Sequence, residues 1–129
     1  MSHYEERLES DIAKIRKRIQ RMGASVVNAV RAATQSALTH DTELATETIL
    51  GDLPINRQAR KLDHRCHIFI ARHLPSAGHL RYISSAMRLS KTLERVGDYA
   101  ETMSRAALQL SAAPIESLAK DLEMMGRHS

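Results

Sequence analysis

Three acidic residues in the last third of the chain are spaced as neighbours on one side of a helix. Glu94, Asp98 and Glu101 follow one another at intervals of four and three residues, which places them in one row along a helical surface. Like charges in such a row repel each other. The row predicts either ligands for a metal ion or an ordinary solvated face, on which Lys91 and Arg95 pair with the acids.

A further carboxylate, Asp52, falls on the apolar stripe of an earlier helical segment, and Asn56 follows one turn later. A carboxylate that faces a packed seam costs free energy unless a cation or hydrogen bonds compensate its charge. Divalent and ferric ions prefer several oxygen ligands, which facing helices can supply. Asp52 is therefore the next candidate metal ligand after Glu94 and Asp98. Asn56, with a neutral amide, is the weakest candidate.

Ligand types for softer metals also occur close together, at His64, Cys66 and His67. Their spacing argues against a shared site, because Cys66 lies on the apolar stripe whereas His64 lies about 200° away around the helix. We interpret Cys66 as a buried thiol and both histidines as surface residues. A single cysteine forms no internal disulfide, which agrees with a reducing compartment.

The densest basic run lies on the polar side of the first helical segment and comprises Lys14, Arg16, Lys17, Arg18 and Arg21. A solvated helical face with acids nearby explains such a run. Nucleic acid is not an expected partner, because no stacking aromatic residues interleave and no known binding motif is present. A docking surface for an acidic protein or for anionic membrane lipids is the alternative.

Catalytic motifs do not accompany these residues. The five glycines form no phosphate-binding loop, and the sequence contains no G-x-S-x-G nucleophile elbow. The lone cysteine is predicted to be buried rather than activated. We therefore expect a protein that is not an enzyme.

Long helical segments must position all of these residues. From residue 8 to residue 37 apolar side chains recur every three or four positions, which is typical of an amphipathic helix in coiled-coil-like packing. Residues 40–42 interrupt this pattern, and Asp41 can cap a second helix that carries its apolar stripe to Phe69. Gly51 and Pro54 interrupt this stripe, and Pro54 lacks an N–H group, so we expect a kink or a short break near Asp52.

A third segment begins after the turn at residues 74–78 and has its inward side marked from Leu80 to Ala107. Small residues on that side, among them Gly97, would let a neighbouring backbone approach closely. The three segments predict an all-α, up-down-up antiparallel three-helix bundle over residues 1–111. Residues 112–129 are expected to form a linker and a short helical segment from Ile115 to Met125.

Composition agrees with a single helical domain. The chain of 129 residues can bury one core, and its aromatic content of 3% favours helices over a sheet. No apolar run approaches the roughly 18 residues that a membrane span needs. The first residues are polar and acidic, unlike a secretory signal, so we expect a cytoplasmic location. The net charge of +4 suits an acidic partner or merely aids solubility.

The order of these signals resembles the PhoU repeat, a three-helix unit of bacterial proteins that regulate phosphate uptake. The resemblance rests on Met22-Gly23, Asp41, the stretch Thr48-Ile49-Leu50-Gly51-Asp52-Leu53-Pro54-Ile55-Asn56, Pro75, Leu80-Arg81, and Leu93-Glu94-Arg95-Val96-Gly97-Asp98. It covers roughly residues 4 to 110, and the last motif is its most specific part.

Three features depart from the family pattern. PhoU proteins usually contain two repeats, whereas this chain carries one complete repeat and residues 115–126 resemble the opening of another. Pro54 is unusual within the second helix of the family. His79 stands where an Asp commonly precedes Leu-Arg.

The resemblance implies a non-catalytic adaptor in phosphate homeostasis. Such an adaptor restrains high-affinity phosphate transport and phosphate-starvation signalling by contacting the ATPase subunit of the phosphate transporter and a sensor histidine kinase, with at most peripheral membrane contact. The family's Glu(Asp)-x-x-x-Asp motif binds metal in some members, and Glu94 and Asp98 match it, so the implied cofactor is iron, zinc or another divalent metal ion. The alternatives are a metal- or phosphate-binding accessory protein of another transporter and a structural helical dimerisation module.

In a lone repeat, the apolar helix surface on which a second repeat would pack stays uncovered. Two copies related by a two-fold axis can cover that surface for each other. We therefore expect a homodimer that imitates the six-helix arrangement, with the segment from Ile115 to Met125 at the junction. In the alternative, this segment folds back, caps the surface and leaves a monomer.

Overall fold

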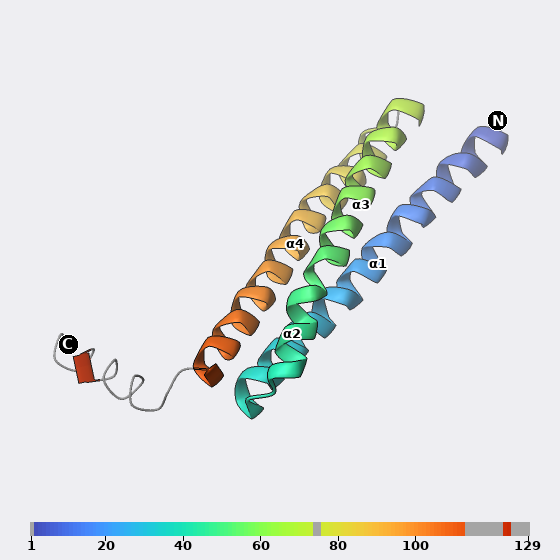
Figure 1. Ribbon diagram of the computed structural model, residues 1–129. Coiled ribbons are helices and arrows are strands. Elements are labelled where there is room, and N and C mark those ends of the chain that lie inside the picture. Colours follow the sequence, from blue (N-terminus) through green and yellow to red (C-terminus); the bar gives the residue numbers. More distant parts are fainter. Residues whose placement is uncertain (1, 74–75, 113–122, 125–129) are drawn as a thin grey trace.

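The computed structural model describes residues 2–73, 76–112 and 123–124. Its helices are α1 (Ser2–Thr39), α2 (Thr42–Leu50), α3 (Asp52–His73) and α4 (Ala77–Ala112). Figure 1 shows α2 and α3 running back along α1, and α4 returning beside them. The expected all-α, up-down-up bundle is confirmed, and the described ranges contain no strand. Apart from residues 123 and 124, the segment from Ile115 to Met125 lies outside these ranges.

The turn between α1 and α2 follows from two consecutive residues. His40 adopts a left-handed backbone with a φ of 57°, which ends α1. The side chain of Asp41 then accepts a hydrogen bond from the backbone N–H of Leu44 over 3.0 Å. This bond satisfies one of the free N–H groups at the start of α2. The prediction that Asp41 caps the second helix is confirmed.

The expected interruption near Asp52 is a break at Gly51, not a kink at Pro54. The N–H of Gly51 donates to the carbonyl oxygen of Glu47 over 2.9 Å and closes α2. Asp52 then begins α3, which places Pro54 in the first turn of the new helix. N–H groups of a first turn have no partner within their helix, so proline is tolerated there.

The fourth helix begins earlier than the sequence pattern predicts. It starts at Ala77 rather than near Leu80, because Ser76 caps it by accepting a hydrogen bond from the backbone N–H of His79 over 3.4 Å. Leu80 is exposed, so its assignment to the inward side was wrong. The buried row of α4 runs through Ile83 and Ala86 and reaches His79, which is half-buried, one turn before.

The core lies along the seam shared by α1, α3 and α4. Its largest fully buried apolar side chains are Ile15, Met22, Leu62, Cys66, Phe69 and Ile83. Near the end of α1 the buried position is Ser36, whereas Ala37, which the periodic pattern assigned to the stripe, is exposed. The buried positions Leu8, Ile15, Met22 and Ser36 are separated by seven or fourteen residues, so the buried row keeps a repeat of 3.5 residues to the end of α1, and Ala37 lies one position outside it.

Gly97 lets α4 approach α3 closely, as the sequence pattern predicts. A Cβ atom at this position would lie 3.3 Å from Cγ2 of Ile55 and 3.7 Å from Oδ1 of Asp52. A contact of 3.3 Å is tighter than the usual separation of carbon atoms. The glycine therefore brings the start of α3 against the middle of α4, where the acidic residues lie.

Within the described residues, no helix is both long enough and apolar enough to cross a bilayer.

Candidate metal centre

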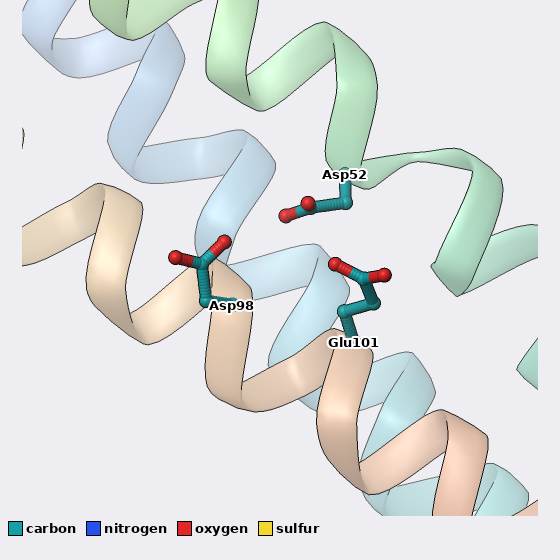
Figure 2. Close-up of side chains that lie close together, drawn as sticks. All are labelled: Asp52, Asp98 and Glu101. Atoms are coloured by element: carbon teal, nitrogen blue, oxygen red, sulfur yellow. The ribbon is translucent and has the colours of Figure 1, made fainter.

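Asp52, Asp98 and Glu101 meet where the first turn of α3 faces the middle of α4, and their carboxyl groups point toward one another in Figure 2. One carboxylate oxygen from each residue lies within 4.8 Å of the others. Among the described residues, no other group of three or more histidine, cysteine, aspartate or glutamate side chains is close enough to share an ion. Three of the five predicted ligands thus come together, one from α3 and two from α4.

Asp52 is the most buried member of this group, with 8% of its surface exposed. Its Oδ2 atom accepts a hydrogen bond from Nδ2 of Asn56 over 3.2 Å. Its Oδ1 atom is buried and has no hydrogen-bond donor in the described structure. An unpartnered buried carboxylate oxygen is costly, and a cation would supply the missing partner. The donor set therefore fits a metal ion.

Protonation offers a second way to stabilise the same arrangement. Burial raises the pKa of Asp52 to about 6, and hydrogen bonding to Glu101 and the negative charges of Glu101 and Asp98 act in the same direction. Two carboxyl groups can hydrogen bond to each other only when one of them carries a proton. Without a metal, Asp52 is the group that holds this proton below about pH 6.

Glu101 is the member whose charge is stabilised. Hydrogen bonds to Asp52 and then to Arg105 lower the pKa of Glu101. Arg105 donates from Nε and Nη2 to Oε1 of Glu101 over 2.9 and 2.7 Å. All three ligand candidates supply oxygen, which suits hard cations such as ferric iron, manganese or magnesium better than zinc.

Glu94 and Asn56 take other positions. Glu94 lies one turn before Asp98 and lines a separate cavity of about 420 Å³ with Lys91, His67 and other residues of α3 and α4. It is not a member of the three-carboxylate group. Asn56 contacts the group as the hydrogen-bond donor to Asp52, so its amide supports a ligand candidate.

The interpretation of the cysteine and histidine cluster is confirmed. Cys66 is fully buried, whereas His64 and His67 are exposed. Burial raises the pKa of the Cys66 thiol to about 11, and the charge of Asp63 adds to this effect. The thiol is therefore neither a reactive nucleophile nor a ready metal ligand.

A polar contact that the sequence analysis missed lies at the far end of the bundle. His73 is buried, and its Nε2 atom lies 2.5 Å from Oδ2 of Asp11. The hydroxyl of Tyr4 donates to the backbone carbonyl of His73. Burial alone would raise the pKa of Asp11, but hydrogen bonding to His73 and the charges of His73, Arg72 and Lys14 outweigh it and lower this pKa. His73 continues the spacing of Cys66 and Phe69 along the stripe, a signal that could have identified it.

Comparison with known proteins extends over most of the chain. Residues 19–107 match the family described as PhoU domain. The phosphate-specific transport system accessory protein PhoU of Serratia marcescens is 31% identical over 127 residues, which cover 98% of this chain and 52% of that protein. The protein of the same name from Escherichia coli is 29% identical over 98% of this chain and 53% of its own length.

A homologue from Aquifex aeolicus is 32% identical over 84% of this chain and 49% of its own length. The chain thus spans about half the length of the curated relatives it matches. Its relatives are accessory proteins, and the expectation that the chain is not an enzyme is confirmed by this kinship. The chain belongs to the PhoU family, of which it carries a single repeat.

Proposed function

We propose that this protein is a cytoplasmic, non-catalytic adaptor that restrains high-affinity phosphate transport and phosphate-starvation signalling. The observation that carries the proposal is the match to the PhoU domain over residues 19–107. The similarity of nearly the whole chain to accessory proteins of the phosphate-specific transport system supports it further. On this proposal the partners are the ATPase subunit of the phosphate transporter and a sensor histidine kinase.

The architecture suits an adaptor. Helices α1 and α4 contain 38 and 36 residues, so each extends for roughly 55 Å at a rise of 1.5 Å per residue. One side of each helix packs in the core and the other side is exposed. Two long exposed faces on a single small bundle provide room for more than one partner.

The group of Asp52, Asp98 and Glu101 has a part in this proposal. A cation held by the three carboxylates would tie the first turn of α3 to the middle of α4 and stabilise their contact at Gly97. We propose iron, manganese or another hard cation as the occupant, with zinc less well matched to an all-oxygen donor set. Glu94, which lies one turn before Asp98 on α4, stays a candidate metal ligand because it belongs to the family motif.

Affinity capture tests the proposed partners. We expect the tagged chain, expressed in phosphate-replete cells of its host, to retain the transporter ATPase subunit and the sensor histidine kinase identified by mass spectrometry. Capture of these partners requires a folded surface. Leu62→Asp, which disrupts the core, therefore serves as the control and should retain neither partner. Recovery of neither partner by the folded chain would contradict the proposed function. Metal binding without either partner would favour an accessory protein of another transporter.

A homodimer is the assembly that we propose. Leu50 and Leu53 flank the break between α2 and α3 and expose 65% and 58% of their surfaces. Beside them lies a groove of about 270 Å³ whose lining includes Leu44, Gly51 and Pro54. Exposed apolar surface of this kind is unfavourable in water. A second copy of the chain, related by a two-fold axis, can cover this surface.

Light scattering at micromolar concentration tests the assembly. We expect a dimeric mass for the full chain and a monomeric mass for Leu50→Glu with Leu53→Glu, because paired charges oppose burial of this surface. Leu89→Glu with Leu110→Glu is the matched control, since these two leucines expose 44% and 56% of their surfaces but lie on α4. A monomer at every concentration would refute the dimer.

A further inference from the structure

We propose that the groove between α1 and α3, at the end of the bundle that holds the start of α1, binds an acidic protein segment with an apolar side chain among its carboxylates. The two helices run antiparallel there, so early residues of α1 face late residues of α3 (Figure 1). This inference rests on the proposed function, because it assigns a surface and a partner chemistry to the adaptor.

Three adjoining cavities lie along this groove. The largest, about 510 Å³, is lined by Arg7, Ser10 and Lys14 of α1 and by Arg72 of α3, together with Glu6 and Asp11. A smaller one of about 60 Å³ shares Lys14, Asp11 and Arg72 with it. A third of about 290 Å³ shares Arg7 and Arg72 and adds Tyr4 and His73. Because they share these residues, the three cavities adjoin one another, and together they are called the depression below.

Four cations line the depression in two rows. Arg7 and Lys14 are seven residues apart on α1, and Arg65 and Arg72 are seven residues apart on α3. Seven residues span about 10 Å along a helix. In the described part of the chain, Arg7, Lys14 and Arg65 form no ion pair, and Arg72 lies 3.6 Å from Asp11. Cations spread over this length fit several carboxylates in sequence rather than one small anion.

The lining of the depression also contains two acidic residues, but its net charge remains positive. Asp11 lies 2.5 Å from Nε2 of His73 and is also approached by Arg72. Its lowered pKa keeps it ionised, and these neighbours compensate its charge. Glu6 is the other acid in the lining, so two carboxylates stand against four cationic side chains, which leaves a formal net charge of +2 with histidine counted as neutral. The charge of the groove is therefore complementary to an acidic ligand.

The floor of the small cavity supplies the apolar part of the recognition. Ile15, Ile68 and Phe69 line it beneath Lys14, Arg65 and Arg72. A volume of about 60 Å³ exceeds the roughly 10–15 Å³ that one water molecule needs, so it can hold the end of an aliphatic side chain. Such a side chain would anchor the segment while the cations around it bind carboxylates. Inorganic phosphate could use the charges but not this floor.

Fluorescence anisotropy with a labelled synthetic peptide tests the proposal on the full chain. The probe is a short glutamate-rich peptide with one central leucine, compared with the same peptide carrying serine in place of leucine. We expect the leucine peptide to bind more tightly and its affinity to fall with added salt. Lys14→Glu with Arg65→Glu should weaken binding by about tenfold or more.

The controls separate this groove from general attraction of charge. Arg31→Glu with Arg88→Glu changes the net charge by the same amount at two exposed residues that line none of the three cavities, and binding should stay within about twofold. None of these four cations forms an ion pair in the described structure, so helicity by circular dichroism should be unchanged in both variants.

Several outcomes would overturn the proposal. The first is an equal loss of peptide affinity in the two double variants. The second is equal affinity for the leucine and serine peptides. The third is full displacement of the peptide by inorganic phosphate added at the same total negative charge. Binding of the chain to phosphatidylglycerol vesicles through Lys14 and Arg65, with no binding of the peptide, would assign the groove to membrane lipid instead. Peptide binding without capture of the transporter ATPase or the kinase would sustain this groove while refuting the proposed function.

Discussion

Replacing Asp52 by Asn is expected to stabilise the metal-free protein at neutral pH and to abolish its stabilisation by added metal. Asp52 has a pKa of about 6 in the folded protein and 3.8 as an ordinary aspartate. The folded state therefore binds more protons than the unfolded state between these values, and stability falls as the pH rises from about 4 to about 6. Asn carries no charge, and its Nδ2 group can donate to Glu101 as the protonated acid does.

The difference between 3.8 and about 6 corresponds to at most about 3 kcal/mol in the free energy of unfolding above pH 6. The opposite effect on Glu101, whose pKa is lowered, reduces the net gain. Urea unfolding in the presence of a chelator, from pH 4 to pH 8, measures the gain. Asp63→Asn is the matched control, because Asp63 is an exposed acid on the same helix. Equal stability changes for the two variants would contradict a buried Asp52 with a raised pKa.

The metal arm of the experiment uses the same proteins without chelator. A cation present at about a hundred times its dissociation constant should stabilise the wild type by about 2.7 kcal/mol. Asp52→Asn, and equally Asp98→Asn with Glu101→Gln, should lose that stabilisation and the bound metal detected by elemental analysis. Undiminished metal content in the double variant would remove Asp98 and Glu101 from the site.

Replacing Leu62 by Asp is expected to unfold the domain at room temperature. Leu62 has no exposed surface and lies in the core formed by α1, α3 and α4. The change removes apolar contacts and buries a charge without a partner, which together exceed several kcal/mol in a domain whose total stability is about 5–15 kcal/mol. Circular dichroism should show the loss of helicity.

A milder substitution keeps this prediction quantitative. Leu62→Ala should remain folded and lose about 2–5 kcal/mol in urea unfolding. Leu89→Ala, at a half-exposed position on α4, should lose less than about 1 kcal/mol. Similar losses at both positions would contradict the assignment of Leu62 to the core.

Local sequence signals were sufficient for most of the fold. The apolar spacing of α1 and the capping residue Asp41 predicted where the first two helices meet. The start of α4 was misplaced because Ser76 was read as part of a turn and not as a cap. A kink or a short break was expected near Asp52, and the structure has the break, because Gly51 ends α2 and a proline is tolerated in the first turn of α3.

The candidate site could be predicted only in part. The row of Glu94, Asp98 and Glu101 spans about 10 Å, and a single aspartate on a facing helix can reach only one part of it. Which part it reaches depends on how far α3 is shifted along α4, and the packing of Ile55 against Gly97 sets that shift. Periodicity within one helix carries no information about such a shift between helices.

The contact between Asp11 and His73 shows the same limit. The two residues are 62 positions apart and lie on different helices. Each is an ordinary polar residue in its own local pattern, and only the antiparallel packing of α1 and α3 brings them together. Pairings of this kind require the tertiary structure.

Cys66 gives the molecule an internal reporter of its own opening. It is the chain's single cysteine and has no exposed surface, and its raised pKa of about 11 keeps the thiol protonated at neutral pH. A thiol reagent can therefore attack only during the brief intervals when α3 separates from its neighbours. The labelling rate then equals the intrinsic rate multiplied by the population of that open form. The local opening of the bundle can thus be measured by labelling Cys66 in the unmodified sequence, without introducing a probe.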